Sequence, residues 1–167
     1  MRVIADILHR AAVLPLVVAS LALFALMVMT FCDVMLRSIL DAPIEAATEL
    51  TRLFMAIMVF AVMPVMSARG EHINVDLLDG VFDRLNIARW RDGLVYLACG
   101  AMLWWPAGRV VVLAERARMY GDVTEYVRFP VFYVSWFIAI MTYVTMVALL
   151  ARGAAILFAP RLLEARA

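Results

Sequence analysis

The chain contains four long apolar stretches that carry almost no charge. Residues 11–32 and 129–151 have no charged side chain, and residues 53–68 and 93–108 each extend in helical register past one flanking Arg. An α-helix rises about 1.5 Å per residue, so roughly 20 apolar residues cross a hydrocarbon core of about 30 Å. The stretches are apolar on every side, whereas a helix that covers a soluble core has a polar face. The sequence therefore predicts an integral membrane protein.

Prolines, glycines and charges divide the chain into four predicted membrane-spanning helices. Asp41 can cap the second helix and Pro43 suits its first turn, Pro106 lies inside the third helix, and the fourth is expected to end near Gly153. The predicted fold class is all-α, with spans at residues 11–39, 43–68, 91–115 and 129–152. These spans form a single domain over residues 1–167 and leave no room for a soluble catalytic domain.

The distribution of arginine predicts the orientation. With an even number of spans, both termini lie on one side of the membrane. The termini and the middle connection carry Arg2, Arg10, Arg69, Arg84, Arg89, Arg91, Arg152, Arg161 and Arg166, whereas the other two connections carry Arg37, Arg52, Arg109, Arg116, Arg118 and Arg128. Nine arginines against six place both termini in the cytoplasm by the positive-inside rule. The first stretch is longer than a signal-peptide core and no small-residue cleavage site follows, so we expect it to be retained.

Residues 75–86, between the second and third spans, have the pattern of an amphipathic helix. On a helical wheel the apolar residues fill one half and the polar residues fill the other. This predicts an interfacial helix that lies along the membrane. The polar half holds three Asp and one Arg, so anionic headgroups would not attract it. Two interpretations stay open, a connector that rests on the bilayer and a brace that docks against a partner subunit.

Charged residues gather at the ends of the first two spans. Glu49 and Arg52 are three residues apart and Asp33 and Arg37 are four apart, so each pair can meet on one helical face. We expect Glu49 and Arg52 to tie the second helix to Arg37 on the first. Contact with a partner protein and an ion or substrate path are the alternatives, since ionisable residues near membrane depth are often functional.

The segment Arg69-Gly70-Glu71-His72 closes the second span. Gly70 fits a left-handed C-terminal cap, and Arg69 suits the negative end of the helix dipole. His72 and His9 are the only histidines and both fall outside the apolar stretches, which disfavours a membrane haem. The two cysteines are too few for a metal site. We predict no catalytic, cofactor or metal site.

Residues 33–78 contain an Arg at the end of the first helix, a turn with an acid and a proline, Glu-Leu-x-Arg, an apolar helix, and Arg-x-Glu-His-Ile-x-Val-Asp. The residues of this pattern are Arg37, Pro43, Glu49, Leu50, Arg52, Arg69, Glu71, His72, Ile73, Val75 and Asp76. In this pattern the stretch resembles the small membrane subunit of tripartite ATP-independent periplasmic (TRAP) transporters, the DctQ-type permease. The plan of four spans covers the remainder of the chain.

The resemblance implies a non-catalytic subunit in the bacterial inner membrane. Such a subunit pairs with a large permease that carries the substrate and sodium sites, and a periplasmic binding protein delivers an organic acid. The small subunit would enlarge the fixed scaffold and help dock the binding protein, with no cofactor of its own, and its amphipathic helix would brace the assembly at the cytoplasmic surface. The expected structural or partner-contact residues are Arg37, Glu49, Arg52, Arg69, Gly70, Glu71, His72 and Asp76.

Other classes fit the sequence less well. A small four-helix membrane enzyme would need polar residues that converge on a cofactor. A small homo-oligomeric exporter would place a lone acid deep in an early span, whereas Asp33 lies near the end of its span with Arg37 one turn away. The chain shows no internal repeat of the kind that builds self-sufficient carriers. A net charge of +1 argues against a nucleic-acid partner.

Overall fold

The computed structural model describes residues 2–70 and 88–158, and these residues form five helices. The helices are α1 (Arg2–Leu40), α2 (Ala47–Arg69), α4 (Ala88–Met102), α5 (Trp104–Tyr120) and α6 (Val131–Phe158). By length and composition, four spans can cross a membrane: Val13–Leu40, Ala47–Arg69, Trp90–Tyr120 and Val131–Phe158. This confirms the predicted all-α membrane fold with four spans. The predicted amphipathic helix at 75–86 lies outside the described residues, as do Glu71, His72 and Asp76.

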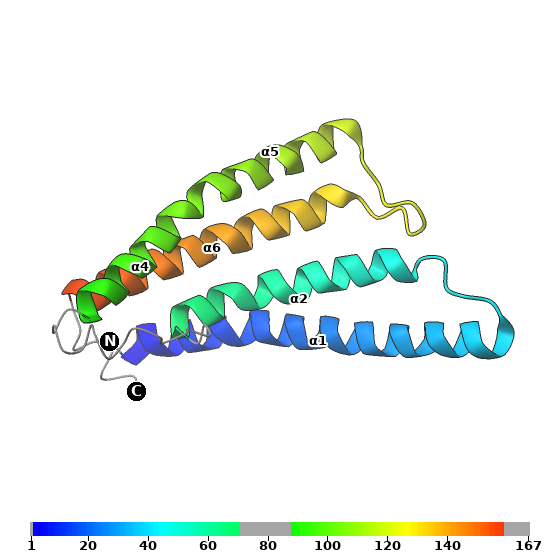
Figure 1. Ribbon diagram of the computed structural model, residues 1–167, viewed down its shortest axis with the longest axis horizontal. Coiled ribbons are helices and arrows are strands. Elements are labelled where there is room, and N and C mark those ends of the chain that lie inside the picture. Colours follow the sequence, from blue (N-terminus) through cyan, green and yellow to red (C-terminus); the bar gives the residue numbers. More distant parts are fainter. Residues whose placement is uncertain (1, 71–87, 159–167) are drawn as a thin grey trace.

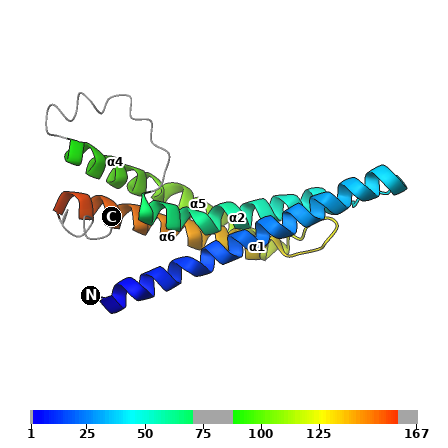
Figure 2. The ribbon, with the colours of Figure 1, turned by 90° about the horizontal axis from the view of Figure 1, so that it is seen from below.

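The helices pack in an open row (Figures 1 and 2). Within the described residues, α1 contacts only α2, α2 also contacts α6, and α6 contacts both α4 and α5. The start of α1 and the end of α6 lie at one end of the row, and the connections at 41–46 and 121–130 lie at the other (Figure 1). The row is therefore not a closed bundle around a central space.

The third span is interrupted at Leu103, where the sequence predicted a single helix. Pro106 has no N–H, so the carbonyl of Met102 receives no hydrogen bond from it. Leu103 itself keeps helical hydrogen bonds, because its N–H donates to the Cys99 carbonyl (3.2 Å) and its carbonyl accepts from the Ala107 N–H (3.0 Å). Proline therefore divides the span into α4 and α5, and α5 continues beyond the predicted end at residue 115 to Tyr120.

The fourth span does not end near Gly153 as predicted, and α6 continues to Phe158. Gly153 is buried where α6 crosses α4. A Cβ atom at Gly153 would lie 2.9 Å from Leu97 Cγ and 3.0 Å from the Gly93 carbonyl oxygen. The glycine thus permits close approach of two helices, a role that small residues often have between membrane helices.

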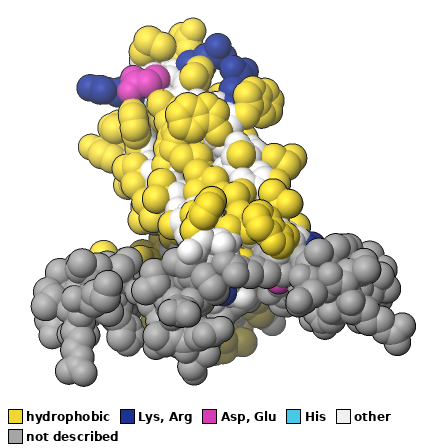
Figure 3. All heavy atoms as spheres, turned by 90° about the vertical axis from the view of Figure 1, so that its left-hand side faces the viewer, with side chains coloured by type: hydrophobic (Ala, Val, Ile, Leu, Met, Phe, Trp, Pro, Cys, Tyr) yellow, Lys and Arg dark blue, Asp and Glu magenta, His cyan; other side chains and the backbone are white. Residues whose placement is uncertain are grey.

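Small side chains fill the contacts between helices, and large apolar side chains point outward. The buried positions include Ala61, Ser67, Ala107, Ala114, Ala139 and Thr145. On the face that Figure 3 shows, hydrophobic side chains cover most of the described surface, and charged side chains lie toward its upper and lower edges. Only 11% of the most apolar window of α1 is buried inside the protein. Most of the span surface is thus free to contact lipid or a partner.

Candidate functional sites at the two ends of the helices

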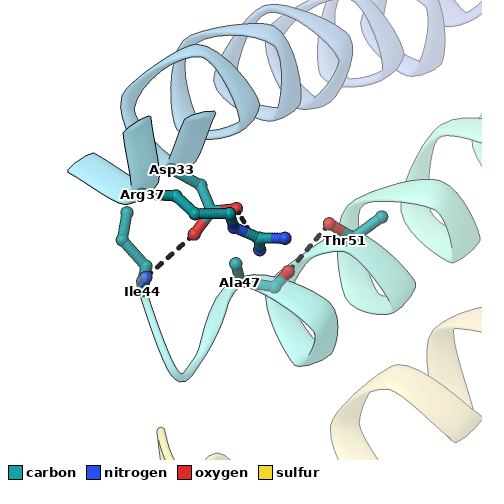
Figure 4. Close-up of polar contacts among 5 residues, drawn as sticks. All are labelled: Asp33, Arg37, Ile44, Ala47 and Thr51. Atoms are coloured by element: carbon teal, nitrogen blue, oxygen red, sulfur yellow. Dashed lines mark hydrogen bonds and ion pairs between the residues drawn. The ribbon is translucent and has the colours of Figure 1, made fainter. Parts of the chain in front are cut away.

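Asp33 joins α1 to the turn that precedes α2. One carboxylate oxygen accepts a hydrogen bond from the Arg37 guanidinium, and the other accepts one from the backbone N–H of Ile44, both at 2.8 Å (Figure 4). Asp33 is buried, with 8% of its surface exposed, whereas the Arg37 side chain is 65% exposed. The predicted Asp33–Arg37 pair is confirmed, and the Asp33–Ile44 contact is an addition that the sequence did not reveal.

The predicted cap of α2 by Asp41 is wrong. The helix begins at Ala47, and Ala46 at the N-cap position makes no side-chain cap hydrogen bond. Asp41 instead adopts a left-handed conformation with φ 51° in the turn. Asp33 therefore supplies, from the neighbouring helix, the carboxylate that fixes this turn.

Glu49 holds the loop 121–130 that connects α5 and α6. One of its carboxylate oxygens accepts hydrogen bonds from the consecutive backbone N–H groups of Tyr126 (3.0 Å) and Val127 (3.3 Å). The other oxygen is buried without a hydrogen-bond partner. Arg52 is exposed and forms no ion pair with Glu49 in the described part of the chain. The predicted tie from Glu49 and Arg52 to Arg37 is thus wrong, because Glu49 satisfies loop amides instead.

The loop is closed by its own hydrogen bonds. Thr124 N–H donates to the Phe129 carbonyl (3.0 Å), Phe129 N–H donates to the Thr124 hydroxyl (2.9 Å), and Val131 N–H donates to the Asp122 carbonyl (3.0 Å). Tyr126 and Val127 are exposed although Glu49 holds their backbone. The loop is therefore an ordered structure with apolar side chains on its outside.

Arg152 of α6 binds the C-terminal end of α2, at the opposite end of the row. Gly70 has φ 70° and its N–H donates to the Met66 carbonyl (2.9 Å), which confirms the predicted left-handed cap. The Arg152 guanidinium donates to the Ala68 carbonyl (2.8 Å) and lies over the Tyr96 ring, 5.4 Å from its centroid. A cation is favourable at this end of a helix. The guanidinium also fills the space that a Cβ at residue 70 would need.

The role of Arg152 is not visible in the sequence pattern. In the sequence it looks like an ordinary basic residue at the end of an apolar span, and its partners Ala68 and Tyr96 lie on other helices. Arg69, which was predicted to suit the helix end, is exposed on the last turn of α2.

These charged side chains hold backbone groups of neighbouring segments. No group of three or more His, Cys, Asp or Glu side chains that could hold a metal ion occurs within the described residues. The carboxylates of Asp33 and Glu49 accept backbone N–H groups, and Arg152 donates to a backbone carbonyl. Each side chain therefore connects two segments that are separate in the sequence.

The family described as the DctQ component of tripartite ATP-independent periplasmic transporters matches residues 26–158. The matched range includes Asp33, Glu49 and Arg152 and all of α2, α4, α5 and α6. No curated protein and no solved structure matches the chain.

Proposed function

Because the chain belongs to the DctQ component family of tripartite ATP-independent periplasmic transporters, and is thus a small permease component, we propose that it is a non-catalytic scaffold subunit. It assembles with a large permease in the bacterial inner membrane and helps a periplasmic binding protein to dock. The complex takes up organic acids with sodium as the coupling ion, which the large permease binds.

The scaffold role is supported by the hydrogen bonds that join α2 to the α4–α6 half of the row at both ends of α2. Glu49 holds the loop before α6 at one end, and Arg152 holds the last turn of α2 at the other. Between these ends, small buried residues such as Ala61, Ala139 and Thr145 bring the helices close together. Carriers that alternate between states move one repeat against another around a site at the midplane. A row of helices that is held together by hydrogen bonds at both ends is suited to the part of such a transporter that does not move.

The docking role is supported by the loop 121–130. It lies at the end of the row opposite the start of α1 and the end of α6 (Figure 1), which is the periplasmic end if the termini are cytoplasmic. Its backbone is held by Thr124 and Glu49, while Tyr126 and Val127 project outward. A preformed loop loses little conformational entropy when a partner binds it.

Reconstitution into liposomes tests this function. The purified chain alone, supplied with a sodium gradient and candidate organic acids, should give only background flux. Addition of the large permease and the binding protein should give uptake without ATP, and collapse of the sodium gradient should abolish it. The control is the large permease with the binding protein but without this chain.

Saturable uptake by this chain alone would contradict the proposal and would favour the small exporter class instead. The acid that such an exporter would use is Asp33, but Asp33 is already bound to Arg37 and to the Ile44 N–H. Full uptake by the permease and binding protein without this chain would show that no scaffold is required.

A further inference from the structure

The outward face of α5 carries an arginine at membrane depth. Arg109, which the arginine count assigned to the connection after the third span, is exposed and lies within the span Trp90–Tyr120, about three helical turns before Tyr120. Its neighbour Gly108 faces Tyr143 of α6, whose hydroxyl is 3.9 Å from the position of a Gly108 Cβ. Tyr143 belongs to the charge-free stretch 129–151. Arg109 therefore lies beside the apolar part of α6 rather than at the end of a span.

Arg109 has no polar partner among the described residues. The ion pairs found there join Asp33 to Arg37 and Arg91 to Asp92. The nearest acid along α5 is Glu115, which is six residues away and so about 9 Å further along the helix axis. An ionisable side chain inside a membrane normally pairs with another group or faces a polar cavity. Arg109 thus presents an unmatched positive charge on an exposed helix face.

Met102, which shares one side of the span with Arg109, lies just before the interruption at Leu103. The interruption at Leu103 leaves the Met102 carbonyl without a hydrogen bond from Pro106. Leu103 keeps a helical conformation (φ −70°, ψ −16°), so the break consists of one carbonyl that has lost its donor within the helix. In a membrane helix such a freed backbone group is tolerated where a neighbouring helix or water satisfies it.

Met102 and Trp105, on the Arg109 side of the span, are 76% and 79% exposed, whereas Trp104 lies on the other side and its ring meets that of Tyr143 edge-on. Tryptophan that faces lipid is usually found at the membrane–water interface, whereas Trp, Met and Arg are enriched in the centres of protein interfaces.

We propose that a membrane helix of the large permease covers this face and contributes a carboxylate to Arg109. The Arg109 face consists of Met102, Trp105, Arg109 and Leu113, which recur every three to four residues and share one side of the span. The proposal rests on the proposed function, since it names the surface through which the scaffold joins its partner. The positive charge of Arg109 favours a partner helix that carries an acidic side chain. The exposed Trp105 provides a large apolar contact next to Arg109.

The test is capture of the large permease from membranes that contain both chains, with a tag on the small subunit. The amount of recovered permease is divided by the amount of recovered small subunit, so that low expression is not mistaken for weak binding. Arg109→Leu and Arg109→Glu should each lower this ratio at least roughly tenfold, because the acid of the partner loses its counter-charge. Arg109→Lys should retain most of the capture. Arg118→Leu, which removes an exposed arginine from the opposite side of α5, should change the ratio little.

When the permease acid that faces Arg109 is replaced by arginine, the Arg109→Glu variant should capture the permease again. Unchanged capture by Arg109→Leu would overturn the proposal. If Arg109→Leu left capture unchanged but lowered the thermal stability of the small subunit alone in vesicles, the result would indicate that Arg109 binds lipid headgroups. Failure of the unsubstituted chain to capture the permease would overturn the proposed function, and this inference with it.

Discussion

Two acidic side chains, Asp33 and Glu49, accept hydrogen bonds from the backbone of the connections at 41–46 and 121–130. Asp33 accepts the N–H of Ile44 and Glu49 accepts those of Tyr126 and Val127. Hydrogen bonds to an ionised carboxylate are stronger than those between neutral groups, and a buried N–H without an acceptor is costly. The two carboxylates therefore determine the shape of the two connections at this end of the row.

Asp33→Ala should destabilise the protein more than Arg37→Ala. The first change leaves the Ile44 N–H and Arg37 without their acceptor, at a cost of about 1–3 kcal/mol. The second removes a side chain that is 65% exposed, and exposed ion pairs contribute about 0–1 kcal/mol. Thermal unfolding of the purified chain in detergent measures both. Equal losses would mean that the ion pair, and not the Ile44 contact, is the important one.

Glu49→Ala should loosen the loop 121–130. Amide hydrogen exchange at Tyr126 and Val127 should accelerate roughly tenfold or more, because both N–H groups lose a charged acceptor. Glu49→Gln should have a smaller effect, since the amide oxygen can still accept a hydrogen bond.

Glu45→Ala is the matched control, because Glu45 is an exposed acid in the turn before α2. If exchange at Tyr126 and Val127 were the same in Glu49→Ala and Glu45→Ala, Glu49 would not hold the loop.

Among the described helices, α4 and α6 approach each other closely. Gly93, Gly100 and Gly153 each face a neighbour that a Cβ would meet at or below 3.0 Å. At Gly153 two of the three nearest atoms belong to the α4 backbone, which cannot move aside as a side-chain end can. Close approach of the two helices therefore depends on glycine.

Gly153→Ala should destabilise the chain by about 1–3 kcal/mol, the usual cost of forcing extra volume into a packed contact. Gly108→Ala is the matched control in the neighbouring helix. There the nearest atom is the Tyr143 hydroxyl at 3.9 Å, so alanine should be neutral or stabilising by about 0.5–1 kcal/mol. Thermal unfolding in detergent separates the two variants. A neutral Gly153→Ala would mean that α4 and α6 can separate without loss.

Across the assembled row, the described connections at 41–46 and 121–130 lie together at one end (Figure 1). The excess of arginine at the termini and the middle connection predicts that this end is periplasmic. The side of the membrane also decides which connections can meet the soluble binding protein.

Reporter fusions test this orientation. Fusions after Ala42, Asn86, Gly121 and Ala167 should report periplasm, cytoplasm, periplasm and cytoplasm, in that order. The two predicted cytoplasmic positions control for the two periplasmic ones, since each reporter is active on one side only. A periplasmic signal at Asn86 would contradict both the orientation and the docking role of the loop 121–130.

The sequence predicted the four spans, the family, the Gly70 cap and the Asp33–Arg37 pair. Each depends on the residues of one segment, because span length, a linear motif and contacts one turn apart are local properties. It did not predict the partners of Glu49 and Arg152, which lie 77 and 84 residues away along the chain, or the contact of Gly153 with α4. Those contacts depend on which helices become neighbours and in what register. In an apolar span every face is similarly hydrophobic, so the sequence pattern does not reveal which face packs inside, and the packed row decides it.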